Sequence, residues 1–474
     1  MHATEADLRG LATSLAGTVV LPDDAEYSSL RKPVLGQLAE LLPQAVVRVA
    51  NPADVAEALA FARTRAMPFA LRSGAHSFAD FCCTDGLLID LGQMDDITLD
   101  GDVVTVEPGA RISGLGERLA QHGRVTPCGW CPSVAVGGSV LGGGYGMLSR
   151  AYGLGCDHLL AAQVVLADGR VLWVDQDREP ELFWALRGAG AGNFGVVTAM
   201  RLRTYPAPRV ATFVHHWPWS QAARVVDAWQ RWAPQAPDEV NAELVLSTMF
   251  MPGSQPRVVL FGAVAGASAS SARPVLEEFL DRVGPGEELE EVAEVSIGAI
   301  NRRPTYAGMP MPPMVEPGPP PGVRPRLRVV KSEFFAEPIP MAGIEALLDS
   351  LVAGWARPQY RELEFVPWAG AFQRVDPAAT AFVHRRPAFM IGHHGMVFAA
   401  ASDAERETVQ QWVRRSWQTV HPYASGAVYP NYPDRDLTDW GRAYYGANLE
   451  RLRQVKARYD PAGFFRFPHA VSPA

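Results

Sequence analysis

The chain has 474 residues, of which 48% are hydrophobic and 20% are charged, and these proportions are ordinary for a globular protein. A chain of this length can bury a large core, so a disordered protein, a small disulfide-stapled domain and a fibrous repeat are excluded. The net charge of −8 disfavours nucleic acid as a partner, because phosphate binding requires a basic surface.

The chain opens with a predicted strand–helix–strand unit. Residues 45–49 and 68–72 are typical of short strands, and the helix between them is marked by Asn51 as its N-cap and Pro52 at its first position. Apolar residues then recur on one helical face. The loop that follows the second strand is residues 73–77.

Two hairpins are predicted within the first 205 residues. One covers residues 97–106 and turns at Asp100-Gly101, and the other covers residues 161–174 and turns at Asp168-Gly169. Two further strands are expected at residues 87–91 and 196–202, and two helices are expected at residues 112–122 and 181–187. This part is therefore expected to be α+β with antiparallel hairpins, and not a run of repeated βαβ units.

The composition changes after about residue 206. Amphipathic stretches at 221–232 and 272–283 predict helices, and residues 440–459 predict one more near the end of the chain. Residues 304–326 hold nine prolines among 23 residues, so they form neither a helix nor a central strand. A surface loop and a lid over a substrate pocket both remain open for this segment.

The longest uncharged run, residues 125–149, is long enough to span a bilayer. Its seven glycines and two prolines indicate a loop-rich cradle instead, and residues 131–146 within it hold too many glycines for any packed element. The five cysteines do not form a secretory framework. The N-terminus shows no signal-peptide pattern, so we expect a soluble, cytoplasmic protein.

Four short segments carry candidate chemistry. Residues 72–77 form a small-residue loop that contains a histidine, residues 131–146 are glycine-rich, and Tyr429, Asn431 and Tyr432 lie near the C-terminus. Considered alone, each of these has an ordinary structural explanation. The fourth segment, residues 190–195, has dinucleotide-fingerprint spacing, but it follows a helix and opens a strand, so a nicotinamide site is rejected.

No metal site is expected. The histidine pairs 215–216 and 393–394 are adjacent in sequence, and adjacent residues on a strand face opposite sides.

Taken together, the motifs make a specific set. In chain order they are RSGAHS, GWCPSVAVGGSVLGGGYG, GCDHL, LADGRV, GNFGVVT, YPNYPDRDL and YDPAGFFRF. This set resembles the berberine-bridge-enzyme-like FAD-linked oxidases of the vanillyl-alcohol-oxidase superfamily. The resemblance implies a two-subdomain FAD-binding domain (1–205), a substrate domain with an antiparallel helix-covered sheet (206–425) and a C-terminal segment that returns to the FAD domain (426–474).

The resemblance also implies two covalent bonds to FAD. His76 matches the family histidine that is bonded to the flavin 8α carbon, and Cys131 matches the cysteine that is bonded to flavin C6, whereas Cys128 lies three residues too early. Two positions depart from the family pattern, since Ala75 stands where glycine is usual and Ser139 where histidine is usual. The other implied cofactor contacts are Arg72, Ser73, Gly74, Ala75, Ser77, Val136, Gly137, Gly138, Ser139, Gly142, Gly143, Gly146, Val197 and Asn431.

The implied catalytic groups are tyrosines. The base is expected to be Tyr432 or, second, Tyr429, and its pKa must be depressed from about 10 to work at neutral pH. Tyr145 matches the family's usual partner, which would lower that pKa by donating a hydrogen bond. The residues expected to line the active site are Phe78, which replaces a common tyrosine, Trp130, Val134, and either His393 or His394 on the strand 389–399.

The leading hypothesis is therefore a bicovalent FAD oxidase acting on an alcohol, a hemiacetal or a related group of a saccharide or hydroxylated natural product. Oxygen is the expected acceptor, because valine at the position of Val134 tends to accompany oxidases in the family. The alternatives are a dehydrogenase with another acceptor and a flavin carrier of low turnover. No nucleic-acid or membrane partner is expected, and the oligomeric state stays open.

Overall fold

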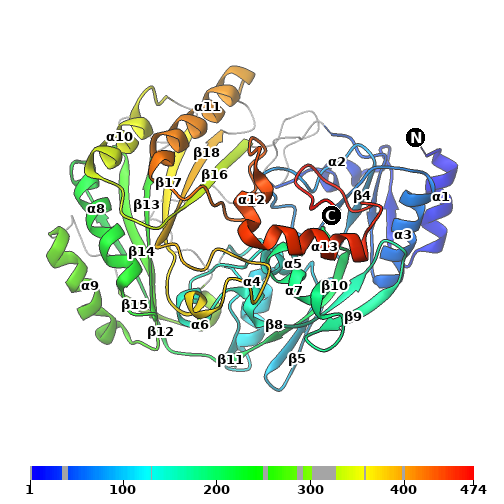
Figure 1. Ribbon diagram of the computed structural model, residues 1–474, viewed down its shortest axis with the longest axis horizontal. Coiled ribbons are helices and arrows are strands. Elements are labelled where there is room, and N and C mark those ends of the chain that lie inside the picture. The colour runs from blue at the N-terminus through cyan, green and yellow to red at the C-terminus, as the bar shows by residue number, and fades with distance from the viewer. Residues whose placement is uncertain are drawn as a thin grey trace.

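The structure is a computed structural model. It describes residues 3–34, 41–129, 131–248, 255–284, 292–300, 327–356, 359–397 and 401–474. Within these residues the chain forms sheets of four, five, two and seven strands together with helices, which is the α+β class that the sequence predicts. The seven-stranded sheet and its helices form one half of the molecule, on the left of Figure 1, and the other sheets form the second half.

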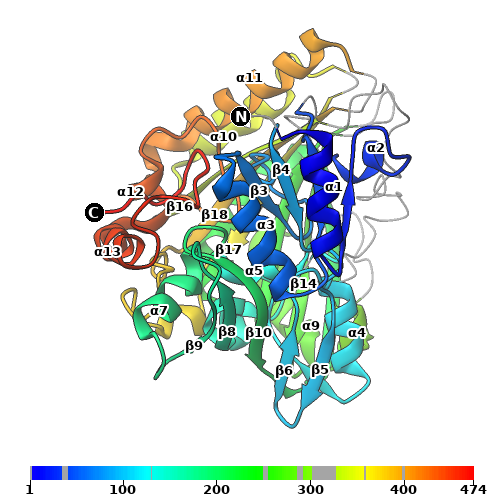
Figure 2. The same ribbon diagram turned by 90° about the vertical axis from the view of Figure 1, so that its right-hand side faces the viewer.

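The four-stranded sheet comes from the N-terminal part and has the order β1-β2-β4-β3. Its strands are Thr18–Val20 (β1), Ala45–Arg48 (β2), Phe69–Arg72 (β3) and Leu87–Asp90 (β4). β4 is parallel to β2 and β3, while β1 is antiparallel to β2. The accompanying helices are Glu5–Ser14 (α1), Tyr27–Leu30 (α2) and Pro52–Thr64 (α3), and Figure 2 shows α1 and α3 side by side next to β3 and β4.

Helix α3 begins where the sequence predicts. The Asn51 side chain accepts a hydrogen bond from the backbone N–H of Asp54 at 3.0 Å, and Pro52 occupies the first turn. This cap and the apolar face of Val55, Leu59 and Ala62 fix the helix against the sheet. The strand that follows, β3, therefore ends at a defined place, and its loop opens into the site described below.

The five-stranded sheet is antiparallel, with the order β5-β6-β10-β8-β9. Its strands are Ile97–Asp100 (β5), Val103–Val106 (β6), Leu159–Val165 (β8), Val171–Asp175 (β9) and Val196–Arg203 (β10). Both predicted hairpins are confirmed, and Gly101 and Gly169 supply the positive φ values of their turns. Arg124–Val125 (β7) and Tyr205–Pro206 (β11) pair separately, and the helices of this part are Ile112–Ala120 (α4), Val136–Leu141 (α5), Ser149–Tyr152 (α6) and Pro180–Ala189 (α7).

Helix α5 contradicts one prediction. Residues 131–146 were expected to contain no packed element, yet residues 136–141 form a short helix. Its apolar residues Val136, Val140 and Leu141 are buried in the core of this half. Burial of these three side chains outweighs the cost of two helical glycines, which is about 1 kcal/mol each.

The seven-stranded sheet has the order β15-β12-β14-β13-β17-β18-β16, and all its pairs are antiparallel. Its strands are Val210–Trp217 (β12), Val240–Ser247 (β13), Arg257–Ala265 (β14), Ala293–Val295 (β15), Leu327–Phe335 (β16), Tyr360–Pro367 (β17) and Phe389–Val397 (β18). Four helices pack on one face: Ala222–Trp232 (α8), Ala269–Val283 (α9), Met341–Val352 (α10) and Asp403–Val420 (α11).

The opposite face of this sheet turns toward the N-terminal half. Val245, Phe261 and Ala263 pack there against Met147 and Leu148. The pairing register of β16, β17 and β18 places a second, polar set on the same face, because residues paired across strands share a side. That set is Arg328, Ser332, Tyr360, Glu362, Glu364 and His394.

The C-terminal segment packs against the N-terminal half. Residues 440–459 were predicted as one helix, but they form Trp440–Tyr445 (α12) and Leu449–Tyr459 (α13), with a break at Gly446, whose φ is +47°. The Lys456 ammonium on α13 donates to the carbonyls of Asn193 and Phe465. The predicted domain boundaries at residues 205 and 425 stay predictions, and the proline-rich segment 304–326 lies outside the described residues.

Candidate active site

A cavity of about 370 Å³ lies where the two halves meet. Its wall is built by the loop after β3, the glycine-rich segment that ends in α5, the segment between α7 and β10, and the C-terminal segment. The seven-stranded sheet contributes Arg328 and Glu364. Five of the seven motifs that resemble the FAD-linked oxidases therefore come together at one place, although they are spread along the whole chain, whereas GCDHL and LADGRV contribute no lining residue.

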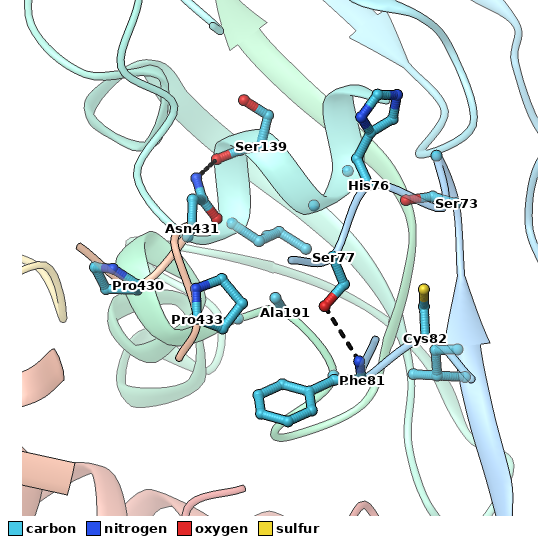
Figure 3. Close-up of a pocket in the computed structure, with 18 of the residues that line it drawn as sticks. Ser73, His76, Ser77, Phe81, Cys82, Ser139, Ala191, Pro430, Asn431 and Pro433 are labelled. Atoms are coloured by element: carbon cyan, nitrogen blue, oxygen red, sulfur yellow. Dashed lines mark hydrogen bonds between the residues drawn. The ribbon is translucent and has the colours of Figure 1, made fainter. Parts of the chain in front are cut away.

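His76 lies in the loop after β3 and is drawn in Figure 3. Its Nε2 is buried and has no hydrogen-bond partner among the described residues. Burial lowers the pKa of His76 to about 4, and the positive charges of Arg111 and Arg328 add to this effect. The imidazole is therefore neutral at pH 7, and an unpartnered neutral nitrogen is a nucleophile that is available for bonding to a cofactor carbon.

Ala75, the residue before His76, is one of the two departures from the family pattern. Ala75 has a φ of +60°, which is the left-handed region that favours glycine. Alanine in this conformation carries a cost of about 1–2 kcal/mol.

Cys131 and Cys128 lie in different surroundings. Cys131 is partly exposed and lines the cavity. Cys128 is buried in the core beneath, and burial raises its pKa to about 12. Of these two cysteines, Cys131 is the one that borders the cavity, which Cys82 also lines from the loop after β3.

Glycines form one wall of the cavity. A Cβ added at Gly138 would meet only Ser73 Oγ, at 4.0 Å, so this position borders open space that a side chain would fill. A Cβ at Gly142 would lie 2.0 Å from Asn431 Oδ1, so glycine is required there for the C-terminal segment to approach. Three predicted contacts, Val136, Gly143 and Gly146, do not line the cavity, because they pack into the surrounding core.

The polar side chains of the cradle are largely occupied by the protein itself. Ser77 Oγ accepts from the backbone N–H of Phe81 at 3.2 Å, and Asn431 Nδ2 donates to the Ser139 carbonyl at 2.9 Å (Figure 3). Ser139 Oγ donates to the Cys128 carbonyl at 2.6 Å. The Arg72 guanidinium donates to backbone carbonyls of Leu30, Arg31 and Cys82, so it holds the loop instead of presenting its charge to a ligand.

These features fit a flavin nucleotide. The residues His76 and Cys131 and a glycine-rich wall border one cavity. The other predicted cofactor residues that line it are Ser73, Gly74, Ala75, Gly137 and Val197.

Tyr432 lines the cavity and has a hydrogen-bond partner that sequence reasoning missed. Its hydroxyl donates to Glu364 Oε2 at 3.0 Å. Burial raises the pKa of Tyr432 well above 10, and the Glu364 carboxylate raises it further. The expectation of a depressed tyrosine pKa is therefore wrong, because the group next to the hydroxyl is an anion that favours the neutral phenol.

The hydroxyls of the other two tyrosines have hydrogen-bond partners other than the Tyr432 hydroxyl. The Tyr145 hydroxyl donates to Glu243 Oε1 at 2.7 Å and not to Tyr432, which contradicts its expected role. The Tyr429 hydroxyl accepts from the backbone N–H of Tyr145 at 3.1 Å and from Asn431 Nδ2 at 3.2 Å. Burial raises the pKa of Tyr429 to about 12, so this residue supports the loops as a neutral phenol.

The two histidines of β18 face opposite sides, as adjacent strand residues must. His393 lies under α11, with Nδ1 at 2.8 Å from Ser416 Oγ, and burial lowers its pKa to about 3. His394 lies on the cavity side, with Nε2 at 3.1 Å from Glu364 Oε2. Of the two candidates, only His394 is placed near the site.

Glu364 and Arg328 are the site residues that sequence reasoning missed. A signal for Glu364 existed, because the strand YRELEFVP carries Glu362 and Glu364 two residues apart in an apolar run. Phe78 and Val134 line the cavity as expected, and Trp130 lies outside the described residues.

Among the described residues, no cluster of three or more His, Cys, Asp or Glu could hold a metal ion, and none of the helices described is long and apolar enough to cross a membrane.

Comparisons with known proteins agree with this geometry. A family model described as an FAD binding domain matches residues 43–175, and one described as "Berberine and berberine like" matches residues 428–472. Both matched segments contribute walls of the cavity.

Several relatives match almost the whole chain. The chain is 31% identical to the uncharacterized FAD-linked oxidoreductase YgaK of Bacillus subtilis (97% of this chain, 98% of that protein) and 30% identical to xylooligosaccharide oxidase of Thermothelomyces thermophilus (96% and 93%). A solved xylooligosaccharide oxidase from Myceliophthora thermophila, in complex with xylobiose, superposes with a TM-score of 0.83 at 27% identity over all of both chains. A wild-type berberine-bridge-enzyme-like protein from Physcomitrella patens gives a TM-score of 0.85 at 25% identity over 98% of this chain and 99% of its own. The chain thus belongs to the berberine-bridge-enzyme-like family of FAD-linked oxidoreductases.

Proposed function

We propose that this protein is an oxidase with FAD bonded to both His76 and Cys131, and that it oxidises a hydroxyl or hemiacetal carbon of a saccharide or a hydroxylated natural product. The observation that carries the proposal is the Tyr432–Glu364 hydrogen bond at the cavity that also holds His76 and Cys131. A buried hydroxyl that donates to a buried carboxylate is a ready path for a proton, and oxidation of an alcohol must release one.

Bound FAD would accept a hydride from the substrate carbon and pass the electrons on to oxygen, which gives hydrogen peroxide. The protein would manage the proton. As the substrate O–H bond breaks, Tyr432 Oη takes that proton and gives its own to Glu364 Oε2, so the phenol is neutral before and after the transfer. The raised pKa of Tyr432 supports this relay over a standing tyrosinate.

The substrate class is supported by the polar face of β16, β17 and β18. Hydroxyl, carboxylate and guanidinium groups gather there, while the neighbouring part of the same face is apolar and packed. Of these groups, Arg328 and Glu364 line the cavity, and a polyhydroxylated substrate matches such donors and acceptors. The relatives named for xylooligosaccharide oxidation favour a saccharide over an aromatic alcohol.

Anaerobic mixing of the purified protein with a panel of oligosaccharides and aromatic alcohols tests the proposal. We expect a saccharide with a free reducing end to bleach the flavin absorbance, and the product to be the lactone or the acid. If no hydroxylated compound bleaches the flavin, the protein is a flavin carrier and the proposal fails. Bleaching by aromatic alcohols alone would move the substrate class to natural products.

Oxygen as the acceptor is tested at Val134, which lines the cavity. Reduced protein is expected to reoxidise rapidly in air and to release hydrogen peroxide. Val134→Leu adds a methylene to the cavity wall. If the resulting overpacking raises the barrier to reoxidation by about 1–3 kcal/mol, reoxidation should slow by roughly tenfold or more. Stopped-flow reoxidation measures this effect, and the anaerobic reduction rate is the control that should not change. Wild-type protein that stays reduced in air-saturated buffer would favour the dehydrogenase alternative.

A further inference from the structure

His394 lies between two charged groups on the cavity side of the sheet. Its Nε2 is 3.1 Å from Glu364 Oε2, and its Nδ1 is 3.1 Å from Arg328 Nη2. The imidazole and the carboxylate are each about 2% exposed, and the Arg328 side chain is 17% exposed. The three groups come from β18, β17 and β16, so the sheet register itself brings them together.

The contact with Arg328 determines which ring nitrogen of His394 carries the proton. A guanidinium group donates hydrogen bonds and accepts none, so His394 Nδ1 must be the acceptor and must be without a proton. The proton of the neutral ring therefore lies on Nε2, which donates to Glu364. Glu364 Oε2 thus receives two donors, Tyr432 Oη at 3.0 Å and His394 Nε2 at 3.1 Å.

Gly392 is a second observation that supports the placement of the His394 imidazole beside the Glu364 carboxylate. It lies inside the central strand β18, where glycine is unfavourable by about 0.5–1 kcal/mol relative to alanine. A Cβ at this position would lie 2.5 Å from His394 Nε2 and 3.4 Å from Glu364 Oε2. The absence of a side chain at residue 392 is what allows the imidazole to lie beside the carboxylate.

Other titratable groups also face this cluster. Glu362 on β17 lies 3.8 Å from Arg328 Nη2, and Tyr145 interacts electrostatically with Glu364 from the glycine-rich segment. Two residues of the loop after β3 also face Arg328. The positive charge of Arg328 lowers the pKa of His76, and the centroid of the Phe78 ring lies 5.4 Å from the guanidinium carbon. The cluster therefore holds one arginine and two glutamates, and His394 is the group that contacts both Arg328 and Glu364.

We propose that His394 is a positioning residue for Glu364, held as the Nε2–H tautomer by Arg328 and given room by Gly392, so that Glu364 stays ionised and oriented to receive the Tyr432 proton. This inference rests on the proposed function for its catalytic consequence only. The tautomer is a property of the protein without substrate.

Variants at residue 394 test the consequence. His394→Leu removes one donor from the Glu364 carboxylate, so the carboxylate is protonated more easily, and the acidic limb of the pH profile of kcat/KM should move up by about one pH unit. His394→Gln can place an amide N–H toward Glu364 and an amide oxygen toward Arg328, so it should restore the wild-type limb. Gly392→Ala should shift the limb in the same direction as His394→Leu, because it displaces the ring.

Gly395→Ala is the matched control. It lies on the same strand, but its Cβ would meet Val409 and Val413 of α11 on the opposite face. It is expected to lower thermal stability without moving the pH profile. The positioning role of His394 would be overturned if the acidic limb of the pH profile shifted equally in Gly395→Ala. It would also be overturned if that limb did not move in His394→Leu.

Nitrogen NMR of histidine-labelled holoprotein, assigned with His394→Gln, tests the tautomer without substrate. We expect a protonated Nε2 and a bare Nδ1 in the wild type at pH 7, and a proton on Nδ1 to appear in Arg328→Met. A protonated Nδ1 in the wild type would refute the proposal even if the oxidase activity is found. If no substrate is found, the proposed function fails, while this measurement still decides whether Arg328 holds the tautomer.

Discussion

Replacing Tyr432 with phenylalanine is expected to slow substrate-dependent flavin reduction by a factor on the order of 10²–10⁴, the usual contribution of a positioned acid–base group. The ring and its packing against Phe78, with centroids 5.2 Å apart, are retained, and only the hydroxyl that donates to Glu364 is lost. Glu364→Gln should cost a similar factor, because the amide cannot take the phenol proton. Anaerobic stopped-flow reduction at saturating substrate measures both effects.

The double variant Tyr432→Phe/Glu364→Gln tests whether the two residues act as a unit. If one proton passes through both, the double variant should be about as slow as the slower single variant, because effects within a unit are not additive. Tyr429→Phe is the matched control, since it removes a hydroxyl that accepts hydrogen bonds from Tyr145 and Asn431 and lies outside the relay. Normal reduction in both single variants would place the base elsewhere, and a Tyr429→Phe loss of equal size would assign it to Tyr429.

Local elements of the fold were predictable because their signals are local. The Asn51-Pro52 start of α3 and the turns at Asp100-Gly101 and Asp168-Gly169 all depend on neighbouring residues, and all three are observed. The failures at α5 and at Gly446 have a different origin. Tertiary burial stabilises a glycine-containing helix in the first case, and a positive φ interrupts a continuous apolar pattern in the second.

The resemblance to the family predicted which segments of the chain line the cavity, but it did not predict which side chains contact one another there. The partner of Tyr432 depends on the register of β17 against β18, which no local pattern specifies. The same register decides that His394 and not His393 faces the site. Glu364 could be suspected from its place in an apolar strand, but its contact with Tyr432 spans 68 residues and needs the folded sheet.

Removing both attachment residues is expected to release the cofactor completely, whereas removing either one alone should not. His76 offers a buried neutral nitrogen without a partner among the described residues, and Cys131 offers a thiol at the cavity wall. Each can bond to a different flavin carbon, so His76→Ala and Cys131→Ala should each keep one bond and stay yellow after acid precipitation. In the double variant the flavin is held by non-covalent contacts alone, and denaturation should free it into the supernatant.

The cysteine assignment has a sharp control within the same loop. Cys128→Ala removes a thiol only three residues away, but that thiol is buried outside the cavity wall and its pKa is raised to about 12, so thiolate is scarce at neutral pH. This variant should keep both bonds, and peptide mass mapping should find His76 and Cys131 on one flavin in the wild type. Free FAD in the wild-type supernatant would refute covalent attachment altogether. A Cys128→Ala protein that loses one bond would show that the thiol comes from the core side of the loop, which would require residues 128–131 to adopt a different path around the cofactor.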